Sequence, residues 1–118
     1  MNSDFLKNWD TQLKKGLLPL CVLQVLSQKE QYGYELIQEL KAVYNTDVTE
    51  STIYPLLTRL LKEGLLTSKW VEQASGIPRK YYSLSADGKK NLKEMIKNIE
   101  AIASAIIKSY ESVTIYKQ

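Results

Sequence analysis

Apolar residues recur at spacings of three and four over most of the chain, which is the pattern of amphipathic helices. The helical spacing covers residues 4–26, 31–45, 50–62 and a long segment that begins at 85. Residues 65–72 and 79–85 differ, because they combine aromatic and β-branched residues with partial alternation. The stretch between them contains Ser, Gly and Pro, which favours a hairpin loop longer than two residues. The pattern predicts a mainly α fold with a β-hairpin wing.

Residues that start or stop helices divide the helical segments further. Gly16 and Pro19 fall inside the first segment and predict a kink or a break into two helices. Thr49 is the expected N-cap of the third helix, and Gly64 is the residue expected to end it. Ser85 opens the last helix. Two short helices joined by a tight turn and followed by a hairpin are typical of a winged helix–turn–helix domain.

The last helix carries an apolar seam that one small domain cannot cover. We expect the helix to have about 28 residues and to be about 42 Å long. Its apolar residues follow the alternating spacing of a coiled-coil seam. The seam and the residues that widen it are Leu92, Met95, Ile96, Ile99, Ile102, Ala103, Ile106, Ile107, Tyr110 and Val113. A second copy of the chain is the expected cover, which makes residues 85–118 a dimerisation helix and residues 1–84 the winged domain.

Other large apolar residues fall into a stripe near the amino terminus and into the core. The stripe, expected to pack on the last helix of the partner, consists of Phe5, Leu6, Trp9 and Leu13. Trp70, Tyr82 and Leu84 are assigned to the core beneath the wing, because large aromatic residues dominate small cores. Cys21 is the one cysteine, so no intrachain disulfide can form, and its apolar surroundings predict a buried thiol.

Composition excludes several classes of protein. The 118 residues are 44% hydrophobic and 25% charged, as in an ordinary single domain, and the net charge is +3. Without histidine and with a single cysteine, most zinc sites and all histidine-based triads cannot be built, so we expect no enzyme, catalytic residue, metal or cofactor. The polar, acidic amino terminus does not resemble a signal peptide, and no apolar run could span a bilayer. We expect a cytoplasmic protein.

The third helix has an outer face suited to nucleic acid. Short or rigid polar donors stand at its amino-terminal end, at Ser51, Thr52 and Tyr54. In a winged helix–turn–helix domain this end enters the major groove, where such donors meet base edges and phosphates. Arg59 would pair with a phosphate or a guanine edge, and Arg79 and Lys80 of the hairpin would reach a neighbouring phosphate row or the minor groove.

An ordered set of motifs resembles the PadR family of bacterial transcriptional regulators. The set comprises YGYEL at 32–36, STIYPLLTRLLKEGLL at 51–66, Trp70 and PRKYYSLSADGKK at 78–90. The short chain and the single helix after the wing are similar to the small subfamily. The resemblance implies a homodimeric repressor that binds double-stranded DNA at a palindromic operator. By motif position it implies DNA contacts from Tyr32, Tyr34, Ser51, Thr52, Tyr54, Pro55, Arg59, Arg79, Lys80 and Tyr81.

Some relatives in this family release DNA when they bind phenolic acids or apolar drugs, which implies a small hydrophobic or aromatic effector. If a ligand cavity exists here, its expected walls are Trp9, Met95, Ile99 and Ile102. Ile99 stands near the position where drug-binding small relatives have a tryptophan, which disfavours a flat aromatic ligand sandwiched there. Two alternatives stay open: a winged-helix module that binds proteins without contacting DNA, and a ligand sensor that acts without DNA.

Overall fold

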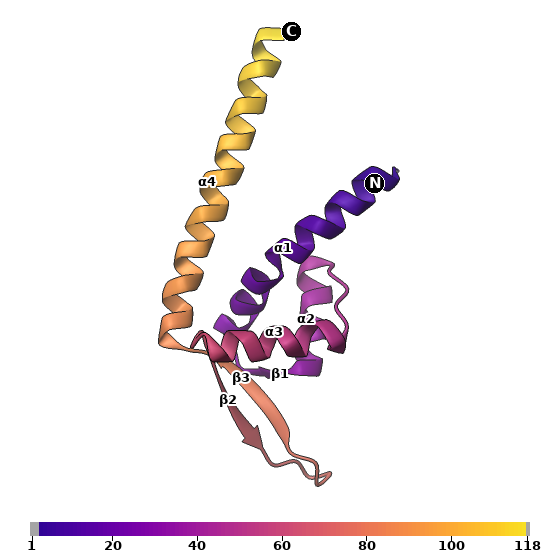
Figure 1. Cartoon of the computed structure of the whole chain (residues 1–118), viewed down its shortest axis with the longest axis vertical. Coiled ribbons are helices and arrows are strands. Elements are labelled where there is room, and N and C mark those ends of the chain that lie inside the picture. Colours follow the sequence, from indigo (N-terminus) through magenta and orange to yellow (C-terminus); the bar gives the residue numbers. More distant parts are fainter. Residues whose placement is uncertain (1–2, 118) are drawn as a thin grey trace.

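The computed structural model describes residues 3–117, so the ends of the predicted 1–84 and 85–118 units, residues 1, 2 and 118, lie outside it. Its elements, in order, are α1 (Asp4–Gln28), β1 (Gln31–Tyr32), α2 (Gly33–Tyr44), α3 (Glu50–Lys62), β2 (Leu66–Val71), β3 (Arg79–Leu84) and α4 (Ala86–Lys117). Figure 1 shows α1 and α4 as two diverging arms above a small domain, with the hairpin of β2 and β3 projecting below. The mainly α fold with a β-hairpin wing is confirmed.

The core lies where the carboxyl-terminal half of α1 meets α2 and α3. Its centre is formed by side chains that are almost inaccessible to solvent, namely Val22, Leu23, Leu36, Leu40, Ile53, Leu57 and Leu60. On α3 the buried residues recur at helical spacing, as the sequence predicts. Burial of each such aliphatic side chain stabilises the fold by about 1.5–3 kcal/mol. Val43 shares the helical spacing of Leu36 and Leu40 but is 58% exposed, whereas the adjacent Tyr44 packs against the core.

The helix ends largely follow the capping residues, with one correction. The Ser3 hydroxyl accepts a hydrogen bond from the Leu6 N–H at 3.0 Å and opens α1. Gly64 has a positive φ of 77° and ends α3, while the Leu65 N–H donates to the Leu60 carbonyl at 3.0 Å, as in a Schellman motif. Of the kink or break predicted in α1, the break is wrong: the helix runs unbroken through Pro19, whose missing N–H costs one bond in a segment held by core packing.

The wing belongs to a three-stranded antiparallel sheet in the order β1-β3-β2. Strand β1 was not predicted, because two residues are too few for alternation to be recognised. It pairs Gln31 with Tyr82 and Tyr32 with Tyr81, and so attaches the start of α2 to the base of the wing.

One face of the hairpin begins in the core and ends in solvent. Leu66 and Trp70 lie on the same side of β2, and their cross-strand neighbours on that side include Tyr82 and Lys80. Leu66 and Tyr82 are buried, but Trp70 is 69% exposed. The assignment of Trp70 to the core is therefore wrong. Trp70 lies on the face of the hairpin that packs on the core, as expected. The helices that cover this face end before the outer half of the hairpin.

Tight contacts join the start of α4 to the hairpin. The Ser85 hydroxyl donates to the Gly64 carbonyl at 2.6 Å and accepts from the Gly88 N–H at 2.9 Å, which confirms Ser85 as the opening residue. A Cβ at Gly88 would collide with the carbonyl oxygen of Leu65, so only glycine fits there. These contacts fix the direction in which α4 leaves the domain.

The two arms expose much of their apolar surface. At the root of α4, Leu92 is buried in the core of its own chain and Met95 packs against that core. Farther along, Ile102, Ile106 and Val113 are at least half exposed, as are Phe5 and Trp9 on α1. Cys21, expected to be buried, is half-buried beside the core, and this burial raises the pKa of its thiol. None of the described helices is long and apolar enough to cross a membrane.

Candidate nucleic-acid interface

The turn between α2 and α3 has the geometry of a helix–turn–helix. Asn45 ends α2 in the left-handed region, with φ 52°, and its N–H donates to the Lys41 carbonyl at 3.0 Å. Asparagine tolerates this conformation better than other residues with a side chain. After three intervening residues Thr49 precedes α3 as its N-cap in extended backbone. The turn thus closes in few residues and sets the angle at which α3 leaves the core.

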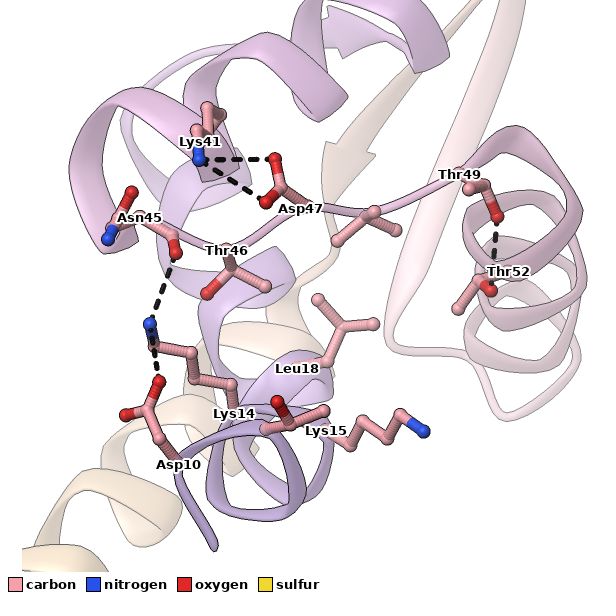
Figure 2. Close-up of a pocket in the computed structure, with 12 residues that line it drawn as sticks. Asp10, Lys14, Lys15, Leu18, Lys41, Asn45, Thr46, Asp47, Thr49 and Thr52 are labelled. Atoms are coloured by element: carbon pink, nitrogen blue, oxygen red, sulfur yellow. Dashed lines mark hydrogen bonds and ion pairs between the residues drawn. The ribbon is translucent and has the colours of Figure 1, made fainter. Parts of the chain in front are cut away.

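Charged side chains brace this turn against α1, as Figure 2 shows. Lys41 Nζ lies 3.1 Å from Asp47 Oδ1, which ties the end of α2 to the turn. Lys14 Nζ donates to the Asn45 carbonyl at 3.1 Å and pairs with Asp10 Oδ2 at 2.9 Å. These residues line a pocket in which Lys14 pairs with Asp10 and Lys41 with Asp47, and these pairs hold the turn against α1. The described residues contain no group of three acidic or cysteine side chains that could hold a metal ion.

The outer face of α3 is exposed over its whole length. Ser51, Thr52, Tyr54, Pro55 and Arg59 all lie on it in contact with solvent. The hydroxyls of Thr49 and Ser51 are 2.8 Å apart at the start of the helix, where backbone N–H groups favour negatively charged partners. Among the described residues Arg59 makes no ion pair, so its guanidinium is available to an external acceptor.

Tyr54 is held in place by a glycine on the neighbouring helix. A Cβ built at Gly33, the first residue of α2, would lie 2.6 Å from the ring carbon Cζ of Tyr54. The ring can therefore rest on the backbone of α2 only because Gly33 has no side chain. Tyr54 and Tyr82 line the same hollow. Burial raises the pKa of the Tyr82 hydroxyl, and the nearby Tyr54 raises it further.

We expect Gly33→Ala to lower the free energy of unfolding by about 1–3 kcal/mol, the usual cost of an added methyl group without space. Urea unfolding measures the change. Gly16→Ala is the matched control, because a Cβ there meets nothing within 4 Å in a helix interior, so stability should rise. In the background of Tyr54→Ala, Gly33→Ala should cost little. An equal cost with and without the Tyr54 ring would contradict the packing argument.

Aromatic contacts organise the base of the wing. The guanidinium carbon of Arg79 lies 4.4 Å from the ring centroid of Tyr32, a cation–π contact. Tyr32 also stacks on Tyr34 at 6.5 Å and meets the edge of Tyr81 at 5.4 Å, both measured between ring centroids. Residues that the motifs grouped as the entry to α2 and as the wing are therefore in direct contact. Strand β1 is what brings them together.

A hollow separates α3 from the wing. It is lined by Tyr32, Gly33, Tyr54, Trp70, Pro78, Arg79, Lys80 and Tyr82, with no acidic residue among them. Sequence reasoning assigned Trp70 to the core and so missed it here. Its position near the end of β2, close to the hairpin loop, was the available signal. Arg59 and the hydroxyls of Ser51 and Thr52 are not part of this hollow and lie elsewhere on α3.

The four residues expected to wall an effector cavity are not gathered in one place by a single chain. Trp9 lies on the amino-terminal part of α1, whereas Ile102 lies well along α4, and the two helices diverge in that direction (Figure 1). Met95 and Ile99 are half-buried nearer the domain. A cavity between these side chains would need a second chain.

Known proteins resemble this chain in sequence and in fold. The family described as "Transcriptional regulator PadR-like family" matches residues 22–94. The transcriptional regulator YqjI of Escherichia coli is 32% identical over 93 residues, which cover 77% of this chain but 43% of that longer protein. An uncharacterized protein of Lysinibacillus sphaericus is 32% identical over 85 residues, covering 70% of this chain and 78% of its own.

Solved structures agree with these matches. A PadR family regulator from Eggerthella lenta has a TM-score of 0.81 at 32% identity, over 89% of this chain and 91% of that one. A PadR-like regulator from Bacillus cereus has a TM-score of 0.72 at 37% identity, over 80% and 92%. Such near-complete coverage is consistent with the small subfamily. The family match, the sequence relatives and the shared fold show that this chain is a transcriptional regulator, not an enzyme, and belongs to the PadR-like family.

Proposed function

We propose that the chain is a homodimeric, sequence-specific repressor that binds double-stranded DNA at a palindromic operator. Residues 1–84 form the DNA-binding unit and residues 85–118 the dimerisation helix. One observation carries the proposal. The outer face of α3 is uncovered and rich in hydroxyl groups, and beside it lies a wing hollow that is basic and lacks acidic residues.

The DNA contacts follow from the dimensions of the major groove, which is about 12 Å wide and admits one helix. The start of α3 enters the groove, so Ser51, Thr52 and Tyr54 meet base edges and Pro55 packs beside them. Arg59 reaches a guanine or a phosphate. The wing, with Arg79, Lys80 and Tyr81, lies along the next phosphates. The hydroxyls of Tyr32 and Tyr34 donate hydrogen bonds to the DNA backbone.

A second copy covers the exposed apolar surface of the two arms. The proposed interface consists of Phe5, Leu6, Trp9, Leu13, Met95, Ile96, Ile99, Ile102, Ala103, Ile106 and Tyr110. Leu92, expected in this interface, already belongs to the core of its own chain and contributes little to it. Two-fold symmetry would set the two α3 helices about 34 Å apart, one turn of DNA. A dimer bound in this way over a promoter would exclude RNA polymerase and so repress transcription.

A small apolar or phenolic effector belongs to the same proposal. In the dimer, Trp9 of one copy can approach Met95, Ile99 and Ile102 of the other, and these side chains would wall an apolar site between subunits. A ligand that fits only one spacing of the α3 helices would then release the operator. Quenching of Trp9 fluorescence in a Trp70→Phe variant by a panel of phenolic and apolar compounds tests this, and no response across the panel removes it.

Selection of bound duplexes from a random pool tests the function. We expect an inverted repeat whose half-sites lie about 10 base pairs apart, centre to centre. If the dimer makes 6–10 phosphate contacts, affinity should fall by about 10³–10⁵ between 50 and 200 mM salt. Failure to enrich any sequence, or an affinity that does not depend on salt, would contradict the proposal and favour a winged module that binds proteins.

A further inference from the structure

Trp70 is an exposed indole on a surface that core packing does not explain. It is 69% exposed on β2, although tryptophan is highly buried on average. The contact that orients it is with Lys80, whose Nζ lies 5.8 Å from the Trp70 ring centroid and 5.7 Å from that of Tyr82. The ammonium group is thus shared between a buried ring and an exposed one on the same side of the hairpin.

The two faces of the hairpin differ in charge. On the face opposite Trp70, the Glu30 carboxylate pairs with Lys69 at 3.2 Å and accepts from the Ser83 hydroxyl at 3.3 Å. On the face of Trp70, Lys80 lies beside the ring and the lining of the hollow toward α3 holds no carboxylate. Arg79 also lines the hollow, but strand alternation puts its side chain on the opposite face, where it lies on the Tyr32 ring. A phosphate on the Trp70 face therefore meets a cation and no carboxylate, whereas on the other face the Glu30 carboxylate stands among the cations.

The position of Trp70 also places it beside the proposed reading helix. Trp70 lines the same hollow as Tyr54, which projects from the first turns of α3. The apolar surfaces proposed for the second copy lie on α1 and α4, the two arms directed away from the wing in Figure 1. A second chain docked on the arms therefore leaves Trp70 uncovered. A duplex that holds α3 in its major groove would pass next to Trp70.

We propose that Trp70 is a DNA-contacting residue, packed against a deoxyribose of the strand that runs between α3 and the wing, with its indole N–H donating to a phosphate oxygen. Lys80 neutralises that phosphate from beside the ring. This contact rests on the proposed function, because it requires double-stranded DNA on α3. Since it touches sugar and phosphate, it strengthens binding to every sequence to a similar degree.

The test uses the full chain and the operator found by selection. Trp70→Ala should raise Kd about 10-fold on the operator and on an unrelated duplex alike, the order expected for loss of one aromatic stacking contact. The slope of affinity against salt should not change, whereas Lys80→Ala should lower it by about 0.9. Trp70→Phe should retain part of the affinity, because the ring remains and the N–H is lost. Thr67→Ala, exposed on the opposite face of the same strand, is the matched control and should bind as wild type.

Fluorescence supplies a second measurement, in which Trp70 itself is left unchanged. In Trp9→Phe the only indole is Trp70, and its emission should shift to shorter wavelength as duplex is added, saturating together with binding. Unchanged emission at saturating duplex, with Trp70→Ala binding within two-fold of wild type, would overturn the contact and leave the function standing. If wild type binds no duplex, the function and the contact fall together. A Trp70→Ala chain that sediments as a monomer would overturn the contact by placing Trp70 between subunits.

Discussion

Replacing Ile102 and Ile106 with Asp should yield a folded monomer whose operator affinity is about 10²–10⁴ times weaker, the factor lost when two linked half-sites become independent. Both side chains are at least half exposed in the single chain, so the change leaves the core of the domain intact. In the proposed dimer it would bury carboxylates in an apolar seam, where desolvation opposes association. The winged domain itself should keep its fold and a weak, half-site affinity.

The matched control adds the same charges to the opposite face of α4. At 100° per residue, Ala101 and Ser112 lie about half a turn from the seam, and both are exposed. Ala101→Asp with Ser112→Asp should therefore remain dimeric and bind the operator nearly as wild type. Sedimentation at micromolar concentration measures the oligomer, and fluorescence anisotropy of a labelled duplex measures affinity. A seam variant that stays dimeric, or a monomer with undiminished affinity, would refute the proposed arrangement.

Arg59→Ala is expected to weaken operator binding by about 1–3 kcal/mol, or roughly 5- to 150-fold, if the guanidinium reads a base. Arg59 projects from the exposed face of α3 without an ion pair among the described residues, so its removal leaves no buried partner unsatisfied. Stability should therefore change little. The affinity for the operator should fall most, and the affinity for unrelated duplexes should fall little.

Arg59→Lys separates the two roles open to this residue. Lysine keeps the charge but not the planar pair of donors that matches the O6 and N7 atoms of guanine. If Arg59 reads guanine, the lysine variant keeps the salt dependence of the wild type and loses preference for the operator. If Arg59 touches only phosphate, lysine should substitute almost fully and Arg59→Ala should weaken all duplexes alike. Competition between operator and unrelated duplex distinguishes these results.

Local chemistry accounts for the parts of the structure that were predicted well. The Schellman end at Gly64 and the opening of α4 at Ser85 depend on a few neighbouring residues, so a single sequence reveals them. The helical spacing of residues 50–62 likewise separates a buried side, which includes Ile53 and Leu57, from the exposed outer face of α3. The family motifs indicated which of the exposed residues are candidates for DNA contact.

Contacts between distant segments account for what was missed. Strand β1 exists only because β3 is present to pair with it, and the use of Gly33 appears only once Tyr54 lies against it. Pro19 was read as a helix breaker, although core packing on both sides of it keeps α1 continuous. Each of these depends on a partner that lies more than ten residues away along the chain.

The sequence by itself determined the order of the helices and the two wing strands, the capping residues Thr49, Gly64 and Ser85, the exposed face of α3 and the apolar seam of α4, because each arises from spacing and short-range hydrogen bonds. Only the tertiary structure decided which apolar residues are covered. Tyr82 and Trp70 share one face of one hairpin, yet the first is 5% exposed and the second 69%. The reason is physical: alternation decides the side of a strand on which a residue lies, whereas burial depends on how far the neighbouring helices extend over that side.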